Sequence, residues 1–168
     1  MELVSGFTPD QISQYTRIQS DREKFVGMND YKWSADDELF TMGAATCLVP
    51  VVVNEGEDTL GLGHFFPSST VKFRILRSPR SAELDMYLEE ASLLVTAGNT
   101  KMYLFGGTAA GENGDFLRGA RDETLRRFSG IGLECVDLTP PQSGLILRIL
   151  VANIQDKTIR YHYEPYDR

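Results

Sequence analysis

Apolar and polar residues follow the spacing of β-strands along most of the chain, in short segments bounded by turn residues. Eight segments are predicted to be strands: Phe25–Lys32, Leu39–Met42, Leu48–Val53, Thr59–Phe66, Lys101–Phe105, Gly132–Leu138, Leu145–Ile154 and Thr158–Tyr163. Strands in runs, with helices inserted between them, indicate an α+β domain rather than a regular βαβ repeat. We therefore expect a single-domain layered sandwich of mostly antiparallel strands flanked by helices.

The polar N-terminal segment, residues 1–25, is predicted to contain a helix. Thr8-Pro9-Asp10 is a typical helix start with proline in the first turn. Apolar residues then recur at helical spacing, at Ile12, Tyr15 and Ile18. An amphipathic helix is therefore expected over Asp10–Lys24, and its apolar face would dock either on its own domain or on a partner.

Two later segments also have the spacing of a helix. The first is Ser81–Thr96, with the inward positions Leu84, Leu88, Ala91 and Val95 and a stop at Gly98-Asn99. The second is Asp115–Phe128, which follows a flexible loop at Gly111–Gly114 and has the inward positions Phe116, Ala120, Leu125 and Phe128. These helices would cover one face of a sheet.

The strands Leu48–Val53 and Thr59–Phe66 are expected to form a hairpin, because the turn sequence Asn54-Glu55-Gly56-Glu57-Asp58 separates them. Pro50 indicates that the first strand lies at an edge or has a bulge. Residues near the open end of a hairpin come together across its two strands. Cys47 and His64 lie there, so the hairpin would bring a thiol and an imidazole within reach of each other.

Composition narrows the classes of function. The chain has 168 residues, enough for one domain with a full core, and a formal net charge of -7. Nucleic acid and anionic membrane surfaces are therefore not expected as partners. Neither a signal peptide nor an apolar run long enough to span a bilayer is present, so membrane insertion is not expected and a cytoplasmic location is the default. No zinc-type or phosphate-binding motif occurs, so no metal or organic cofactor is expected.

Cys47 and His64 could be a nucleophile and its base. A catalytic thiol needs a base, and it needs backbone N–H groups directed at the developing oxyanion. Small residues permit the sharp turns and the close approach of substrate that such a site requires, and they directly precede Cys47 and His64: Gly43-Ala44-Ala45 with Thr46, and Gly61 with Gly63. Thr41 is a candidate for the third group, which accepts a hydrogen bond from the imidazole.

Each of these residues also has a structural interpretation. Free cysteines are often small core residues, so Cys47 could simply be packed. Cys135 is expected to be buried in an apolar strand, and we expect it to alkylate more slowly than Cys47. His162 is expected to be a surface or packing residue. Gly106-Gly107 could line a site or could merely end a strand.

The pattern Thr41-x-Gly43-x-x-Thr46-Cys47, followed by His64 and Pro67, resembles the active-site signature of the CheD chemoreceptor glutamine deamidases. In that family a threonine stands six residues before the cysteine and a histidine seventeen residues after it, as here. Four further features follow the family's order: Val26-Gly27-x-x-Asp30-Tyr31, Phe105-Gly106-Gly107, Gly119-Ala120-Arg121-Asp122 and the turn Gln155-Asp156-Lys157. The resemblance implies a CheD-like deamidase domain over residues 26–168, preceded by an N-terminal extension over residues 1–25.

The resemblance also implies an activity, the hydrolysis of a glutamine side-chain amide on a protein to glutamate and ammonia through a cysteine thioester. It implies that Cys47 is the nucleophile, that His64 is the base and that Thr41 orients His64. The substrate and oxyanion neighbourhood would include Gly43, Thr46, Gly63, Gly106 and Gly107. No metal or cofactor is implied, and the expected partners are the substrate protein that carries the glutamine and a regulatory protein.

Three departures from the family's pattern widen the assignment. Ala45-Thr46 replaces Gly-Ser before the cysteine, Asp137–Pro141 replaces an Asp-x-Gly-Gly stretch, and the first 25 residues are additional. Similar Cys–His arrangements occur in bacterial toxins and effectors that deamidate a host protein, so a chemotaxis role and an effector role, the latter delivered to a host cell without a Sec-type signal, both stay open. The pattern is also compatible with a cysteine amidase acting on a small substrate and with a non-catalytic binding module that has a vestigial site.

Overall fold

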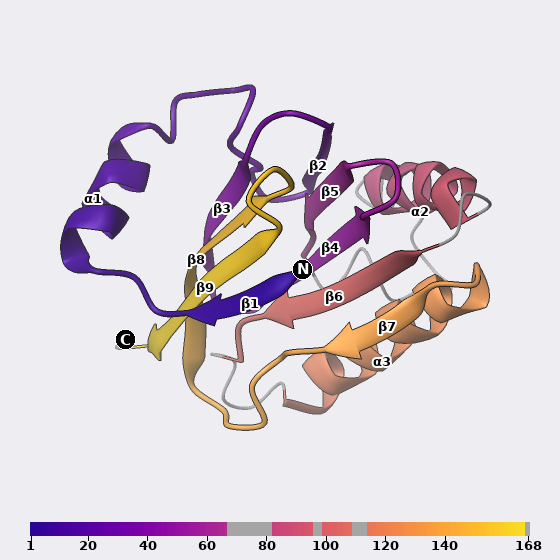
Figure 1. The fold of residues 1–168 in the computed structure, drawn as a ribbon. Coiled ribbons are helices and arrows are strands. Elements are labelled where there is room, and N and C mark those ends of the chain that lie inside the picture. Colours follow the sequence, from indigo (N-terminus) through magenta and orange to yellow (C-terminus); the bar gives the residue numbers. More distant parts are fainter. Residues whose placement is uncertain (67–81, 96–98, 109–113, 167–168) are drawn as a thin grey trace.

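The computed structural model describes residues 1–66, 82–95, 99–108 and 114–166 (Figure 1). Its strands are β1 (Glu2–Ser5), β2 (Asp30–Ser34), β3 (Leu39–Ala44), β4 (Leu48–Asn54), β5 (Thr59–His64), β6 (Thr100–Gly106), β7 (Glu134–Asp137), β8 (Leu145–Asn153) and β9 (Thr158–Pro165). Its helices are α1 (Pro9–Arg17), α2 (Ala82–Val95) and α3 (Gly114–Gly130). The described residues thus have an α+β fold, as the order of the predicted elements indicates.

The described strands form two sheets. One sheet has the order β1-β9-β8-β3 and the other has the order β2-β5-β4-β6-β7. Most neighbouring strands are antiparallel, as expected, whereas β1 with β9 and β6 with β7 are parallel. Helix α1 packs on the outer side of the first sheet, and α2 and α3 pack on the outer side of the second (Figure 1). The result is a mixed sandwich in four layers.

The core between the two sheets positions the candidate residues. Strand β4 directs Val49, Val51 and Val53 into this core, whereas Leu48 and Val52 on its other face pack with residues of α2 and α3. All of β4 is buried, which explains why its sequence is continuously apolar rather than alternating. Because side chains alternate along a strand, a position two residues before Val49 also faces the space between the sheets.

Pro50 lies in an interior strand, so the expectation that it marks an edge strand is wrong. Strand β4 pairs with β5 on one side and with β6 on the other. The ladder with β5 covers Val51 to Asn54 and resumes at the isolated bridge between Leu48 and Phe65. Proline has no N–H to donate, and this interruption allows β4 to keep a proline between two partner strands.

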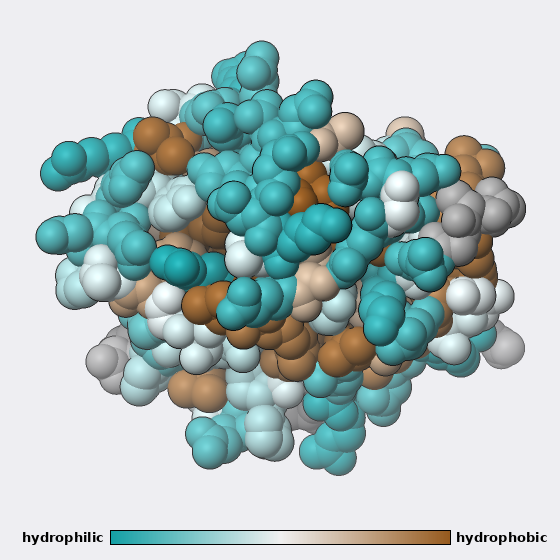
Figure 2. All heavy atoms as spheres, in the orientation of Figure 1, coloured by the Kyte–Doolittle hydropathy of each residue, from teal (hydrophilic) through white to brown (hydrophobic). Residues whose placement is uncertain are grey.

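The first 25 residues contain a strand that the sequence pattern does not predict, since β1 pairs in parallel with β9. Helix α1 begins with a capping box between Thr8 and Gln11 and ends at Arg17, earlier than expected. Its apolar residues pack on the four-stranded sheet: Ile12, Tyr15 and Ile18 against Phe40, Met42, Ile149 and Val151. The helix therefore docks on its own domain, and polar side chains project from it in Figure 2.

Helices α2 and α3 pack with the residues that their spacing predicts. In α2, Leu84, Leu88 and Ala91 are buried together with Tyr87, and Val95 is partly buried. In α3, Ala120 and Phe128 are buried and Leu125 is partly buried. Other predicted positions lie outside the described residues, namely Pro67, Ser81, Thr96, Gly98, residues 111–113 and the side chain of Phe116. Among the described helices, none is long and apolar enough to cross a bilayer.

Candidate active site

Cys47 and His64 face the same space, the core between the two sheets. Leu48 exchanges two backbone hydrogen bonds with Phe65, of 2.9 and 2.8 Å, which sets the register where β4 meets the end of β5. In that register His64 lies opposite Val49, and Cys47 is the preceding residue on the same face. The two candidates are therefore diagonal neighbours across the predicted hairpin.

The His64 ring contacts Thr41 of β3, a strand of the other sheet. The Thr41 hydroxyl oxygen lies 2.7 Å from His64 Nδ1 and 2.7 Å from the backbone carbonyl oxygen of Val26. The carbonyl can only accept, so the single hydroxyl hydrogen is donated to Val26. The hydroxyl must then accept from His64, and the imidazole proton is therefore on Nδ1.

This tautomer leaves a lone pair on the other ring nitrogen of His64, Nε2. Nε2 is buried, and within the described part of the chain it has no hydrogen-bond partner, so the Cys47 thiol does not donate to it. A buried acceptor without a donor destabilises a fold, and each such group in a folded protein calls for an explanation. A substrate group, or a thiol that moves toward the ring, would satisfy this nitrogen.

Burial keeps both Cys47 and His64 neutral. The exposed fraction is 5% for Cys47 and 4% for His64. Removal from water raises the pKa of Cys47 to about 12 and lowers the pKa of His64 to about 4. At neutral pH the structure therefore holds a neutral thiol near a neutral imidazole, and a reaction through sulfur would require the thiol to lose its proton first.

The loop before Cys47 offers two backbone donors. Gly43 has φ +72°, a left-handed conformation that favours glycine, and its carbonyl accepts from the Ala45 N–H at 3.0 Å. After this turn, the backbone N–H groups of Thr46 and Cys47 have no acceptor among the described residues. Two adjacent N–H groups beside a thiol form an arrangement that can stabilise an oxyanion.

Gly106 and Gly107 pack directly against the chain around Cys47. The Gly107 N–H donates to the Cys47 carbonyl at 3.2 Å, and a Cβ on Gly107 would lie 2.0 Å from the carbonyl oxygen of Ala44. A Cβ on Gly106 would lie 2.7 Å from the Cys47 carbonyl oxygen. These glycines allow a close approach of backbones, and because both N–H groups already have acceptors they are not oxyanion donors.

Gly63 does not line the candidate site. It neighbours His64 on β5, so its Cα hydrogens face the opposite side of the sheet. A Cβ there would lie 2.3 Å from the ring of Phe65, which packs with the helices rather than between the sheets. Gly63 therefore belongs to the sequence pattern around His64 but not to the candidate site.

Asn29 holds the end of β5 and is not singled out by the sequence pattern. Its backbone N–H donates to the His64 carbonyl, and its side-chain oxygen accepts from the Phe66 N–H at 3.1 Å. Its φ of +60° is left-handed, which asparagine tolerates better than most residues. A left-handed asparagine can be suspected from sequence, but the strand that it fastens cannot.

Tyr163 of β9 is a second residue that the sequence pattern misses. Its hydroxyl accepts from the Gly106 N–H at 3.2 Å and donates to the Leu138 carbonyl at 3.4 Å. It thereby ties the four-stranded sheet to the glycine pair beside Cys47. Nothing in the local sequence distinguishes it from other aromatic strand residues.

The two cysteines differ in burial in the opposite sense to the expectation. Cys135 is partly exposed on β7, an edge strand, and its Sγ lies 3.6 Å from the Leu133 carbonyl and 3.9 Å from the Leu125 carbonyl. Cys47 is the buried thiol. The expectation of a buried Cys135 is wrong because β7 has a neighbouring strand on one side only, whereas Cys47 faces the space between two sheets.

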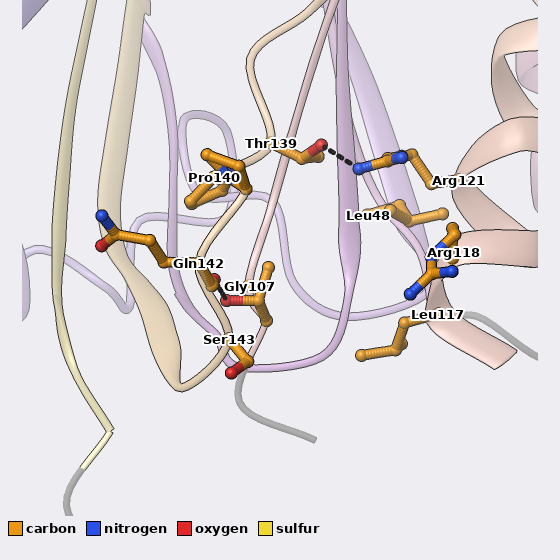
Figure 3. A pocket seen from close by; sticks show the side chains of 11 residues that line it. Leu48, Gly107, Leu117, Arg118, Arg121, Thr139, Pro140, Gln142 and Ser143 are labelled. Atoms are coloured by element: carbon orange, nitrogen blue, oxygen red, sulfur yellow. Dashed lines mark hydrogen bonds between the residues drawn. The ribbon is translucent and has the colours of Figure 1, made fainter. Parts of the chain in front are cut away.

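Leu48, the residue after Cys47, is one of the residues that line a surface pocket of about 140 Å³ (Figure 3). Gly107, whose N–H binds the Cys47 carbonyl, also lines it. The described ranges contain no group of three or more His, Cys, Asp or Glu side chains that could hold a metal ion.

No protein-family model matches the sequence, and no curated protein matches it significantly. The resemblance to the CheD deamidases therefore depends on the spacing of Thr41, Cys47 and His64 and on the flanking motifs alone.

Proposed function

We propose that this chain is a protein-glutamine deamidase, which hydrolyses a glutamine side-chain amide to glutamate and ammonia. One observation supports the proposal above all others. The Thr41 hydroxyl gives its only hydrogen to Val26, so it can only accept from His64 Nδ1. This contact orients the ring and keeps the lone pair on Nε2, which is the role of the third member of a triad.

In the first half of the reaction, His64 Nε2 takes the thiol proton as Cys47 Sγ attacks the carboxamide carbon of the glutamine. Since both groups are neutral, the proton moves during the attack. An Sγ–C bond forms, and the carbonyl π electrons move to the oxygen, which the Thr46 and Cys47 N–H groups stabilise. His64 then gives the proton to the amide nitrogen, the C–N bond breaks, and ammonia leaves a thioester behind.

In the second half, water resolves the thioester. His64 Nε2 accepts a proton from the water as its oxygen attacks the thioester carbon, and the C–Sγ bond then breaks. The proton returns to sulfur, which restores the neutral thiol. The net change is glutamine plus water to glutamate plus ammonia. Thr41 accepts from Nδ1 throughout and so stabilises the imidazolium that forms in each half.

The recessed position of Cys47 favours a long side chain with its amide at the tip. Cys47 is buried, whereas Gly43 is exposed and Ala45 and Thr46 are partly exposed, so the surface comes near the thiol at this loop. A glutamine side chain can reach inward past the loop while its backbone stays outside. A backbone amide would have to bring the polypeptide itself into the space between the sheets.

The test is a search for Cys47-dependent conversion of glutamine to glutamate. Bacterial and eukaryotic lysates are incubated with wild-type protein, Cys47→Ala and Cys135→Ala, and peptides are screened by mass spectrometry. Conversion is expected with the wild type and with Cys135→Ala, and none with Cys47→Ala. The proposal is contradicted if glutamine sites convert equally with all three proteins, or if no site converts with any of them.

One observation favours a second candidate, a binding module with a vestigial site. The Cys47 thiol is buried, its pKa is raised to about 12, and it makes no hydrogen bond to His64. If this candidate is right, wild type and Cys47→Ala capture the same partners from a lysate and neither changes their glutamines. Mass spectra of the captured partners therefore separate the two functions.

A further inference from the structure

Cys47 is held in place by a pair of glycines that belongs to another strand. Gly106 is the last residue of β6, and the Gly107 N–H donates to the Cys47 carbonyl at 3.2 Å. The oxygen of that carbonyl would lie 2.7 Å from a Cβ on Gly106. The backbones approach each other this closely because both residues lack a side chain. The position of Cys47 therefore depends on where the glycine pair lies.

The glycine pair needs support from its neighbours. Two consecutive glycines have no side chains by which they could be packed, and glycine loses more conformational freedom on folding than any other residue. Among the described residues, His64 Nε2 has no hydrogen-bond partner, so a bond to the imidazole does not fix the thiol of Cys47. Hydrogen bonds from surrounding groups to the glycine pair therefore matter for the thiol.

The hydroxyl of Tyr163, on β9 of the four-stranded sheet, provides such a bond. It accepts from the Gly106 N–H at 3.2 Å and donates to the Leu138 carbonyl at 3.4 Å. Burial raises the pKa of Tyr163, so the hydroxyl keeps its hydrogen at neutral pH and can make both bonds. A single hydroxyl therefore ties the end of β6 and the residue after β7 to the other sheet.

The packing of the Tyr163 ring fixes the place of this hydroxyl. On the four-stranded sheet Tyr163 lies opposite Leu147, and Leu147 lies opposite Ala44, the last residue of β3. Residues paired across strands share a face of the sheet, so these side chains point into the space between the two sheets. The ring packs edge-on against Tyr161, with the centroids 6.0 Å apart. The hydroxyl is thus presented to β6 by a ring that is itself held.

Thr41 and Tyr163 contact the two halves of the candidate site from the same sheet. Thr41 of β3 contacts the ring of His64, whereas Tyr163 of β9 contacts the glycine pair that is bonded to Cys47. Both hydrogen bonds cross from the four-stranded sheet to the five-stranded sheet. The placement of the thiol relative to the imidazole then depends on both contacts.

We propose that the Tyr163 hydroxyl is a positioning group for Cys47. It holds Gly106, and through the glycine pair it keeps the thiol in place beside His64 and keeps this end of the space between the sheets closed. Its effect on turnover rests on the proposed function, because that effect takes Cys47 as the nucleophile. The position of Cys47 can be measured without any substrate.

Alkylation of native Tyr163→Phe protein tests the proposal directly, because this change removes the hydroxyl and keeps the ring. Peptide mapping should show that Cys47 reacts about tenfold faster than in wild type, as expected when one hydrogen bond that opposes local opening is lost. Cys135 is partly exposed and should keep its wild-type rate. Tyr161→Phe is the matched control, since Tyr161 lies on the same strand and its hydroxyl makes no hydrogen bond with any described residue. In this control Cys47 should react as in wild type.

Urea separates local opening from a loss of overall stability. Labelling through local opening changes little at low urea, whereas labelling through global unfolding rises steeply. The faster labelling of Cys47 in Tyr163→Phe should therefore be nearly independent of urea below the unfolding transition. An unchanged rate, an equal increase in Tyr161→Phe, or an increase that follows global unfolding overturns the proposal.

Kinetics provide the second measurement, on a glutamine substrate found by the conversion test. Tyr163→Phe should lower kcat about tenfold and leave KM unchanged, because the hydroxyl places the nucleophile and does not bind the substrate. An unchanged kcat overturns the positioning role even if labelling is faster. If wild-type protein converts no glutamine, that result contradicts the proposed function alone, and the labelling rates still decide the role of Tyr163.

Discussion

The two thiols of the chain lie in opposite kinds of surroundings. Cys135 is partly exposed on the edge strand β7, and the nearest polar atoms to its sulfur are the carbonyl oxygens of Leu125 and Leu133. Cys47 is buried between two sheets, on the same face of the hairpin as His64, whose Nε2 has no hydrogen-bond partner among the described residues. Among the described residues, the polar partners of the more exposed thiol are carbonyl oxygens, whereas the thiol that lies near an imidazole is buried.

Access and chemical context are therefore separate determinants of cysteine reactivity. A small reagent reacts with the thiol that it can reach and that ionises, whereas a bound substrate reacts with the thiol whose proton has somewhere to go. Substitutions at His64, Thr41 and Asn29, and labelling of the two thiols, test this difference.

The largest expected effect concerns the proton balance of His64. Its pKa is lowered by burial from 6.5 to about 4, so between these values the unfolded chain binds a proton that the folded chain does not. The free energy of unfolding should therefore fall as pH is lowered through this window, by about 3 kcal/mol from this group. Urea titrations at several pH values should show this fall in unfolding free energy in wild type and in Cys135→Ala. The fall should be absent in His64→Gln. Parallel pH slopes in wild type and His64→Gln would mean that the ring is solvated.

Thr41→Val tests the orientation of His64. It removes the hydroxyl with little change of shape and leaves both the Val26 carbonyl and the His64 Nδ1–H buried without a partner. The expected loss is about 1–3 kcal/mol of unfolding free energy, and a fall in turnover of roughly 10²-fold through misplacement of the ring. Thr41→Ser should restore both. A Val variant as active as the Ser variant would show that the hydroxyl does not orient the base.

Asn29→Gly tests the fastening of β5. Glycine keeps the left-handed backbone and the N–H bond to His64, and it removes the side-chain acceptor for the Phe66 N–H. Turnover is expected to fall about tenfold with little change in KM, and Asn29→Asp should retain most of the activity. Asn99→Gly is the control, since Asn99 is also left-handed and lies outside the site. If the two glycine variants lose activity equally, Asn29 has no special role.

The smallest expected effect is on alkylation of the free protein. Contrary to the expectation from the sequence, Cys135 should react several-fold faster than Cys47 at neutral pH, because burial raises the pKa of Cys47 further and shields it. Labelling followed by peptide mapping gives the two rates, and denatured protein gives the reference in which they should be similar. Faster labelling of Cys47 in native protein would reveal that the site opens readily and that His64 already activates the thiol.

Local patterns predicted most of the strands and helices of the described residues. The valine-rich run, the polar turn and the return strand identified the β4–β5 hairpin, and helical spacing identified the buried face of α2. The pattern missed β1, because a four-residue edge strand has no distinctive alternation. The prediction that Pro50 marks an edge strand was wrong. Strands lie on both sides of β4, and the sequence does not reveal that its ladder with β5 is interrupted at Pro50.

The candidate site shows the same division. The order of residue types along the chain was enough to predict that a hairpin would bring Cys47 and His64 together. Thr41 was also a candidate partner of His64, but its place on the opposite sheet, the donation of its hydroxyl hydrogen to Val26 and the burial of Cys47 rather than Cys135 are seen in the folded structure alone. Strand alternation and turn chemistry involve only a few residues, so they can be recognised from local sequence. Burial and contacts between sheets depend on how the layers of the whole domain pack together, which local patterns do not specify.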